Sequence, residues 1–138
     1  MASGEGHTAV VSILLDSGLD VNRGDRRGFV PLMAAAERGH VAVVDILLSR
    51  KEIEIDRRHP ADYTAIWSAS NRGHLEVVRR LLAAGADPRI AAIYGRTPLE
   101  RARQGGHAEC IQLLEVRCLS LICPSYPHPF HPFLPLLF

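Results

Sequence analysis

The most constraining feature of this 138-residue chain is a Gly-His dipeptide that returns at an almost constant interval. It occurs at Gly6-His7, Gly39-His40, Gly73-His74 and Gly106-His107, so successive copies are 33, 34 and 33 residues apart. A fixed period of this size indicates an array of structural repeats. Because each unit of such an array contacts only its neighbours, we expect an elongated stack with an extended surface for a partner.

The residues on both sides of each Gly-His also repeat. A short helix is expected before the dipeptide, within 30–36, 64–70 and 97–103. A second helix is expected after it, where apolar residues recur at helical spacing in 43–48, 77–82 and 110–114. Each unit is therefore predicted to be a pair of helices joined by a glycine turn.

These motifs, together with Gly18-Leu19-Asp20-Val21-Asn22 and Gly85-Ala86-Asp87-Pro88-Arg89, resemble the ankyrin repeat family. The resemblance covers roughly the first five-sixths of the chain. It implies an all-α fold class, an ankyrin repeat solenoid whose helix-turn-helix units carry extended β-turn tips. We expect an incomplete first repeat at 1–24, repeats at 25–58 and 59–91, a last repeat at 92–116 and a disordered Pro/Phe-rich tail at 117–138.

The predicted first helices begin with recognisable capping residues. Thr64 and Thr97 supply the N-cap oxygen, and Pro98 follows at the first helical position, where a missing N–H has no consequence. Pro31 matches Pro98 in the earlier repeat. There, however, Val30 occupies the cap position and cannot accept a hydrogen bond, so this helix is expected to be capped less well.

The turns are predicted from glycine positions. Gly39, Gly73 and Gly106 lie just past the first helices, where the chain must adopt a left-handed conformation. Aligned tips fall at 25–28, 59–62 and 92–95, and Asp62 stands where glycine is expected. The segment before the second tip, 51–56, is one residue longer than its counterpart, which explains the interval of 34. An interaction role and a neutral insertion both fit this irregularity.

Both ends depart from the repeat. The first unit keeps its second helix, roughly Thr8 to Ser17, without the helix that should cover it, so Val10, Ile13 and Leu14 are expected to be exposed. The chain therefore resembles a piece or short isoform of a longer array.

The C-terminal tail, 117–138, has five prolines and no acidic residue, which favours extended or disordered structure. It is interpreted as a ligand for another protein, a cap over the last repeat, or a splice-derived end without an evolved role. The last interpretation is favoured.

Composition favours a soluble cytoplasmic or nuclear protein. The formal net charge is +1, and Lys51 is the only lysine among sixteen basic residues. Arginine suits contact surfaces, although GC-rich coding explains the bias equally well. Three cysteines, Cys110, Cys118 and Cys123, suggest a reducing compartment. No secretory signal is recognised, and the prolines of the tail argue against membrane insertion.

No metal, cofactor or catalytic site is expected. Histidines of neighbouring repeats lie too far apart to share an ion, and the resemblance implies that they are structural residues at the start of the second helices. In the tail, Cys118, Cys123, His128 and His131 are too close together for a zinc finger. The acidic residues Asp45, Glu76 and Glu109 form no catalytic pattern, and Cys110 near His107 is interpreted as a core residue.

The resemblance implies a partner-binding groove made of the turn tips and first helices. Carried onto this chain, the groove positions are Arg26, Arg27, Phe29, Met33, Glu37, Arg38, Pro60, Tyr63, Trp67, Asn71, Arg72, Ile93, Tyr94, Arg96, Glu100 and Gln104. Aromatic residues and arginines are typical of interaction hot spots. The predicted partner-binding residues are Arg26, Arg27, Phe29, Arg38, Tyr63, Trp67, Arg72, Tyr94 and Arg96. For Trp67, packing between helices is slightly favoured over direct contact with a partner.

Three functions are weighed. The leading one is a monomeric, non-enzymatic protein–protein interaction scaffold that binds an acidic or mixed-charge partner segment. The second is polyanion binding, to nucleic acid or phosphoinositide, through Arg26, Arg27, Arg38, Arg57, Arg58, Arg72 and Arg96, against which the nearby Asp25, Glu37, Glu54 and Asp56 argue.

The third function is a ubiquitin-ligase substrate adaptor, suggested by a faint similarity of Leu119, Cys123 and 134–136 to the SOCS box of some ankyrin proteins. Cys118 and Pro127 do not fit that pattern, and this function is not adopted.

Overall fold

The computed structural model describes residues 13, 16–18 and 20–122 of the chain. Within them lie six α-helices, one short 3-10 helix and no strand, which confirms the predicted all-α fold class. The helices are α3 Pro31–Arg38, α4 Val41–Leu48, α5 Ala65–Arg72, α6 Leu75–Ala83, α7 Pro98–Gly105 and α8 Ala108–Ile122, and the 3-10 helix is η1 Ile93–Gly95.

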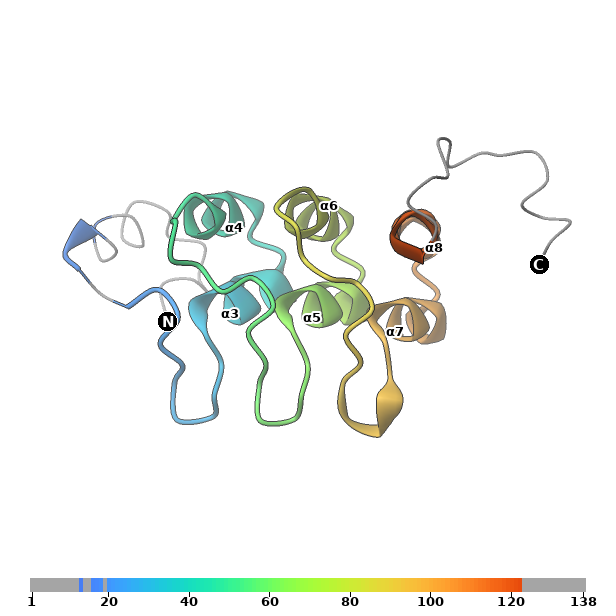
Figure 1. The fold of residues 1–138 in the computed structure, drawn as a ribbon, viewed down its shortest axis with the longest axis horizontal. Coiled ribbons are helices and arrows are strands. Elements are labelled where there is room, and N and C mark those ends of the chain that lie inside the picture. Colours follow the sequence, from blue (N-terminus) through green and yellow to red (C-terminus); the bar gives the residue numbers. More distant parts are fainter. Residues whose placement is uncertain (1–12, 14–15, 19, 123–138) are drawn as a thin grey trace, which may run out of the picture.

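The helices form two layers, with one helix of each repeat in each layer. Figure 1 shows α3, α5 and α7 side by side in one row and α4, α6 and α8 in a second row. The core lies between and along these rows, where Leu47, Leu81 and Leu114 are fully buried. The loops before α3, α5 and α7 project away from the second row and end in three tips (Figure 1).

The predicted caps are confirmed. Thr64 Oγ1 accepts a hydrogen bond from the Trp67 backbone N–H over 3.4 Å, and Thr97 Oγ1 accepts one from Glu100 over 3.2 Å. The Glu100 carboxylate in turn accepts from the Thr97 N–H at 3.0 Å, which completes a capping box. Val30 makes no side-chain cap bond, as expected.

The glycine turns and the Gly-His histidines join one repeat to the next. Gly39, Gly73 and Gly106 adopt φ of 74°, 75° and 71°, which confirms the left-handed turns. The His74 ring donates from Nε2 to the Glu37 carbonyl oxygen at 2.9 Å, and His107 contacts the Asn71 carbonyl oxygen at 3.2 Å. The expectation that these histidines are structural is confirmed.

The C-terminal helix differs from the expectation. Helix α8 continues to Ile122, so the boundary predicted between 116 and 117 lies inside a helix. The Arg117 guanidinium donates to the Leu82 carbonyl oxygen at 2.8 Å and ties this extension to α6. The remainder of the tail lies outside the described residues, as do Val10 and Leu14, whereas Ile13 is 67% exposed, as expected.

Replacing Val30 by threonine is expected to stabilise the fold by about 1 kcal/mol. Val30 has φ −83° and ψ 159°, nearly the same as Thr97 at −82° and 162°, so a new hydroxyl would face the Met33 N–H. Thr64 is fully buried at the equivalent position, which shows that the fold accepts this hydroxyl. The measurement is the urea midpoint. Val30→Ala, which removes methyl groups without adding an acceptor, should lower that midpoint, and an unchanged midpoint for Val30→Thr would contradict the cap assignment.

Alanine substitutions at Gly39 and at Gly106 are expected to distinguish two causes of destabilisation. One is the strain of the left-handed backbone, and the other is the clash of the new Cβ with a histidine ring. Both glycines are left-handed C-caps, so each alanine adds a strain of roughly 1–2 kcal/mol. A Cβ at Gly39 would lie 2.7 Å from His74 Nδ1, whereas a Cβ at Gly106 would meet nothing within 4 Å. Gly39→Ala should therefore destabilise by about 1 kcal/mol or more beyond Gly106→Ala in urea unfolding. Equal losses would show that the histidine does not restrict this turn.

Candidate partner-binding surface

The three tips are built by the same backbone hydrogen bonds. The N–H of the first tip residue donates to a carbonyl four residues later, in Asp25 to Phe29, His59 to Tyr63 and Ala92 to Arg96, over 2.9, 2.9 and 2.8 Å. Neighbouring tips also contact each other, because the Ile93 N–H donates to the Ala61 carbonyl oxygen at 3.2 Å. We call the three tips and the exposed residues of α3, α5 and α7 beside them the tip surface.

The first tip is cationic and well fixed. Asp25 Oδ1 accepts hydrogen bonds from the backbone N–H groups of Arg27, at 2.8 Å, and Phe29, at 3.0 Å. These bonds, that of Phe29 above all, lower the pKa of Asp25, so the carboxylate stays ionised and holds the turn. The side chains of Arg26 and Arg27 are exposed, and neither forms an ion pair with a described residue.

In the second tip a histidine takes the place of Asp25. His59 Nδ1 accepts from the Ala61 N–H at 3.0 Å, so the neutral ring carries its proton on Nε2. The ring stacks on Tyr63 at a centroid distance of 4.2 Å and lies 4.7 Å from Phe29. His59 was not among the predicted site residues, although its alignment with Asp25 in the tip was the available signal.

Two residues other than glycine are left-handed in the tips. Asp62 has φ 65°, which confirms that its position requires the conformation glycine usually supplies. Tyr94 also has φ 65°, directly before left-handed Gly95, and this was not predicted. The Tyr94 side chain is 89% exposed and its neighbour Ile93 is 52% exposed. The third tip therefore presents an apolar and aromatic surface to solvent.

A row of aromatic rings connects the tips to α5. The ring of Tyr63 lies 5.8 Å from Phe29 and 5.1 Å from Trp67. The Trp67 indole N–H donates to the Arg96 carbonyl oxygen at 3.0 Å, and the Arg101 guanidinium lies 5.3 Å from its ring centroid. Trp67 thus packs between repeats and remains partly exposed on the tip surface.

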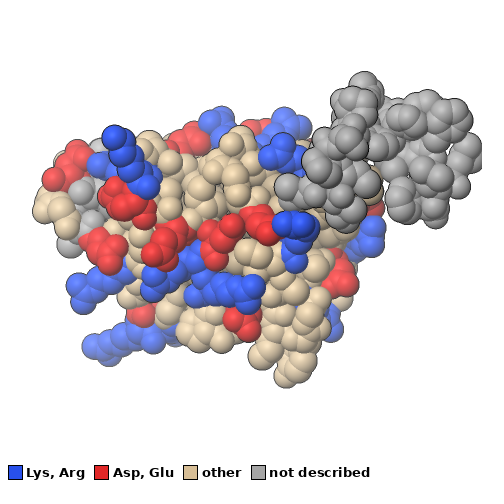
Figure 2. Space-filling view, viewed as in Figure 1, with Lys and Arg blue, Asp and Glu red and all other residues tan. Residues whose placement is uncertain are grey.

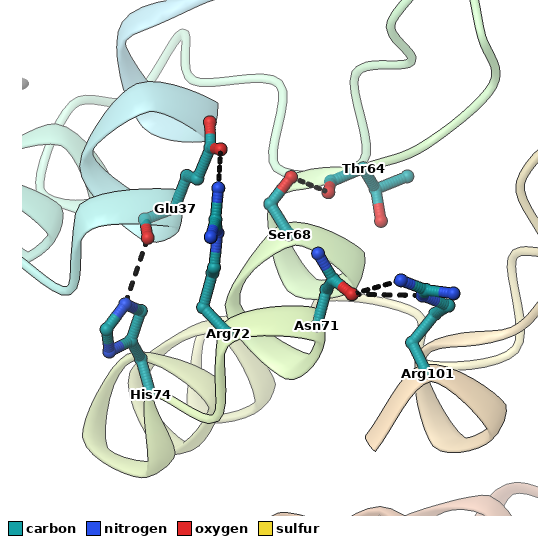
Figure 3. A network of polar contacts seen from close by, with 7 residues as sticks. All are labelled: Glu37, Thr64, Ser68, Asn71, Arg72, His74 and Arg101. Atoms are coloured by element: carbon teal, nitrogen blue, oxygen red, sulfur yellow. Dashed lines mark hydrogen bonds and ion pairs between the residues drawn. The ribbon is translucent and has the colours of Figure 1, made fainter. Parts of the chain in front are cut away.

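Two arginines of the first helices are engaged within the chain (Figure 3). Arg72 donates to Glu37 Oε1 at 3.0 Å, and Arg101 donates from Nε to Asn71 Oδ1 at 3.0 Å. The Arg72–Glu37 pair is largely exposed, so it contributes little to stability, between about 0 and 1 kcal/mol. A partner is therefore able to compete for either group of this pair.

The other predicted groove residues divide between the surface and the interior. Arg38 and Arg96 are exposed and make no ion pair with a described residue. Met33 is fully buried, so its assignment to the groove was wrong: its side chain points into the core beneath α3. Glu100 is exposed, but its carboxylate is engaged in the capping box of α7.

Ligands for a metal ion do not gather in the part of the chain that the structure describes. No three or more of its histidine, cysteine and acidic side chains lie together. Cys110 is buried in the core, and this burial raises the pKa of its thiol. Cys123, His128 and His131 lie outside the described residues. In the same part of the chain no helix has both the length and the apolar character needed to cross a membrane.

Comparison with known proteins agrees with this architecture. Two family models for ankyrin repeats match residues 1–59 and 66–115. The ankyrin repeat protein YahD of Escherichia coli K12 is 36% identical over 110 residues, which are 76% of this chain and 55% of that protein. The ankyrin repeat, SAM and basic leucine zipper domain-containing protein 1 of Echinops telfairi is 35% identical over 109 residues, 77% of this chain and 23% of that protein.

The chain therefore spans about half the length of the first of these relatives and about a quarter of the second. The matched segments contain α3, α4, α6 and α7 in full, nearly all of α5, and the first part of α8. The repeat period, the two helical layers and these matches agree, and the chain belongs to the ankyrin repeat family.

Proposed function

We propose that this chain is a non-enzymatic interaction module that binds one segment of a protein partner across its tip surface. Ankyrin repeats generally mediate contacts between proteins. The observation that carries the proposal is the composition of the tips. The cationic side chains of Arg26 and Arg27 project from the first tip, and Ile93 and Tyr94 project from the third.

The partner segment is extended and acidic or mixed in charge. Neighbouring helices pack about 8–10 Å apart, so the first and third tips lie roughly 20 Å from each other. An extended chain rises about 3.3 Å per residue, and roughly six residues therefore connect the two tips. Arg38 and Arg96 add further exposed cations, which favours acidic residues in the segment.

Binding of a polyanion is less well supported by the geometry. Of the arginines considered for it, Arg57 pairs with Glu54 at 2.8 Å, Arg58 with Asp62 at 3.6 Å and Arg72 with Glu37 at 3.0 Å. Figure 2 shows acidic and basic side chains interleaved on the face it presents. A surface of this kind lacks the continuous positive potential that a phosphate backbone requires.

We also propose that the module acts in the cytoplasm or the nucleus. Cys110 is buried and Cys118 half-buried, and both are free thiols. Free thiols are typical of a reducing compartment. The residues on which a ubiquitin-ligase adaptor role depends, Cys123 and 134–136, lie outside the described residues, so the geometry adds no support for that role.

Alanine at Arg26 and Arg27 together, or at Tyr94, is expected to reduce partner capture at least about five-fold while leaving the thermal midpoint nearly unchanged. These side chains are exposed, unlike that of Tyr63, whose ring is partly buried and stacks on His59. The measurement is quantitative affinity capture from lysate with wild type and variants side by side. Capture should also decline only moderately with salt, because few charges are involved.

The control for this experiment is Arg79→Ala. Arg79 is equally exposed but lies on α6, in the other helical row, where it pairs with Glu76. Proteins retained by wild type and by Arg79→Ala but lost with the tip variants are the expected partners. Equal capture by all the variants would exclude the tip surface as the binding site.

A further inference from the structure

A small depression lies on the tip surface where the repeats 25–58 and 59–91 meet. Aromatic rings of Phe29, Tyr63 and Trp67 line it together with Glu37, Ser68 and Asn71, and its volume is about 140 Å³. Pockets for small-molecule ligands usually have volumes of about 300–1,000 Å³. This depression therefore has the size for a single side chain of a partner.

Glu37 is the only charged residue in the lining, and one of its two carboxylate oxygens has no hydrogen-bond partner among the described residues. Its Oε1 accepts from Arg72, whereas its Oε2 accepts no hydrogen bond from a described residue. Figure 3 shows the second oxygen pointing away from Arg72. Tyr63 is also in the lining, and its hydroxyl makes no hydrogen bond to a described residue. The free oxygen of Glu37 is therefore available to a donor that enters.

Two carboxylates act on the hydroxyl of Tyr63, a residue of the lining. Burial raises the pKa of Tyr63, and the negative charges of Glu37 and Asp25 raise it further. The Arg72 guanidinium pairs with Oε1 of Glu37 and offsets part of this negative charge. A cation that enters would be attracted to the free Oε2, whereas an anionic side chain there would be repelled by it.

The Trp67 ring already carries a cation from the chain itself. The Arg101 guanidinium lies over this ring while it binds Asn71, and it does so without lining the depression. Tyr63 stacks on Trp67, and His59 stacks on Tyr63, so these ring faces are already covered. A second cation would therefore depend on the Glu37 carboxylate, with its apolar stem against the aromatic residues of the lining.

We propose that this depression is a specificity site for one lysine or arginine side chain of the partner segment, held by the aromatic walls and the free oxygen of Glu37. This inference rests on the proposed function, since it concerns the same partner segment. It refines the expected segment: acidic residues contact the exposed arginines, and one basic residue enters between the repeats 25–58 and 59–91.

The test uses short peptides and the fluorescence of Trp67, the only tryptophan in the chain. The probes are four seven-residue peptides with the same acidic and glycine flanks, whose central residue is lysine, arginine, norleucine or glutamate. The lysine or arginine peptide is expected to change Trp67 emission with an affinity at least about ten-fold higher than the norleucine peptide. Glutamate at the centre should bind more weakly still.

Glu37→Gln keeps the shape of the side chain and removes its charge, and is expected to reduce the preference for a basic centre to below about three-fold. The matched control is Glu54→Gln, because Glu54 also pairs with an arginine, Arg57, and lies outside the depression. This control should retain the full preference. Far-ultraviolet circular dichroism and the urea midpoint verify that both variants are folded.

The outcomes separate this inference from the proposed function. If norleucine binds as well as lysine, or if Glu37→Gln leaves the preference unchanged, the specificity site is excluded. If in that case Arg26→Ala and Arg27→Ala still weaken all four peptides, the tip surface remains the binding site and only this inference fails. If no peptide changes the emission of Trp67, the result contradicts the specificity site directly.

Discussion

The structure depends on a contact that recurs at the two junctions described between Pro31 and Ile122, in which a histidine ring enters the space left by a glycine of the preceding turn. His74 lies against Gly39 and hydrogen-bonds to the Glu37 carbonyl, and His107 does the same one repeat later. The glycine lacks a Cβ, so the ring can approach the backbone closely. This contact limits how far each repeat can shift relative to the one before it. It therefore also influences the spacing of the tips, which form the proposed binding surface.

Side-chain bonds between equivalent helices reinforce the same offset. Arg80 on α6 pairs with Asp45 on α4 at 2.9 Å, and Arg117 on α8 donates to the Leu82 carbonyl of α6 at 2.8 Å. Each bond joins residues separated by 35 positions, close to one repeat. Because the Arg80–Asp45 pair is largely exposed, it adds specificity of register more than stability.

The sequence predicted those features that depend on nearby residues. The helix caps at Thr64 and Thr97 depend on backbone geometry within four residues, as do the left-handed glycines. The repeat period located the histidines of the Gly-His dipeptides. The contacts of Glu37 with Arg72 and of Trp67 with Arg101 were not predicted, because they join residues 35 and 34 positions apart and depend on side-chain rotamers. The burial of Met33 was missed for the same reason.

The extension of α8 to Ile122 shows a different kind of error. Prolines of the tail begin at Pro124, and the predicted boundary was placed where the repeat pattern ends rather than where proline first prevents a helix. The Arg117 bond to the Leu82 carbonyl then gives the extra turns a tertiary anchor. A helix is therefore limited by its packing and by proline, and not by the length of the repeat.

The arginines of the first tip differ from several of those on the helices. An arginine on a helix can lie beside the equivalent helix of the preceding repeat, where an acidic oxygen is within reach, as for Arg72 and Arg80. Arg38 on α3 is exposed and makes no such pair with a described residue. An arginine at the end of the first tip has no such neighbour, and Arg26 and Arg27 project into solvent. Arginine thus joins neighbouring repeats where it pairs across helices. In the first tip it is available for the proposed contact with a partner.

The first and third tips differ in chemistry, so the tip surface distinguishes the two orientations of a partner segment. The first tip is held by Asp25 and presents cations, whereas the third presents Ile93 and the left-handed Tyr94. The left-handed backbone conformation of Tyr94 costs about 1 kcal/mol of strain. The strained turn directs the tyrosine ring into solvent. A partner with acidic residues at one end and an apolar residue at the other would fit in a single orientation, because reversing it would place its charges against the apolar tip.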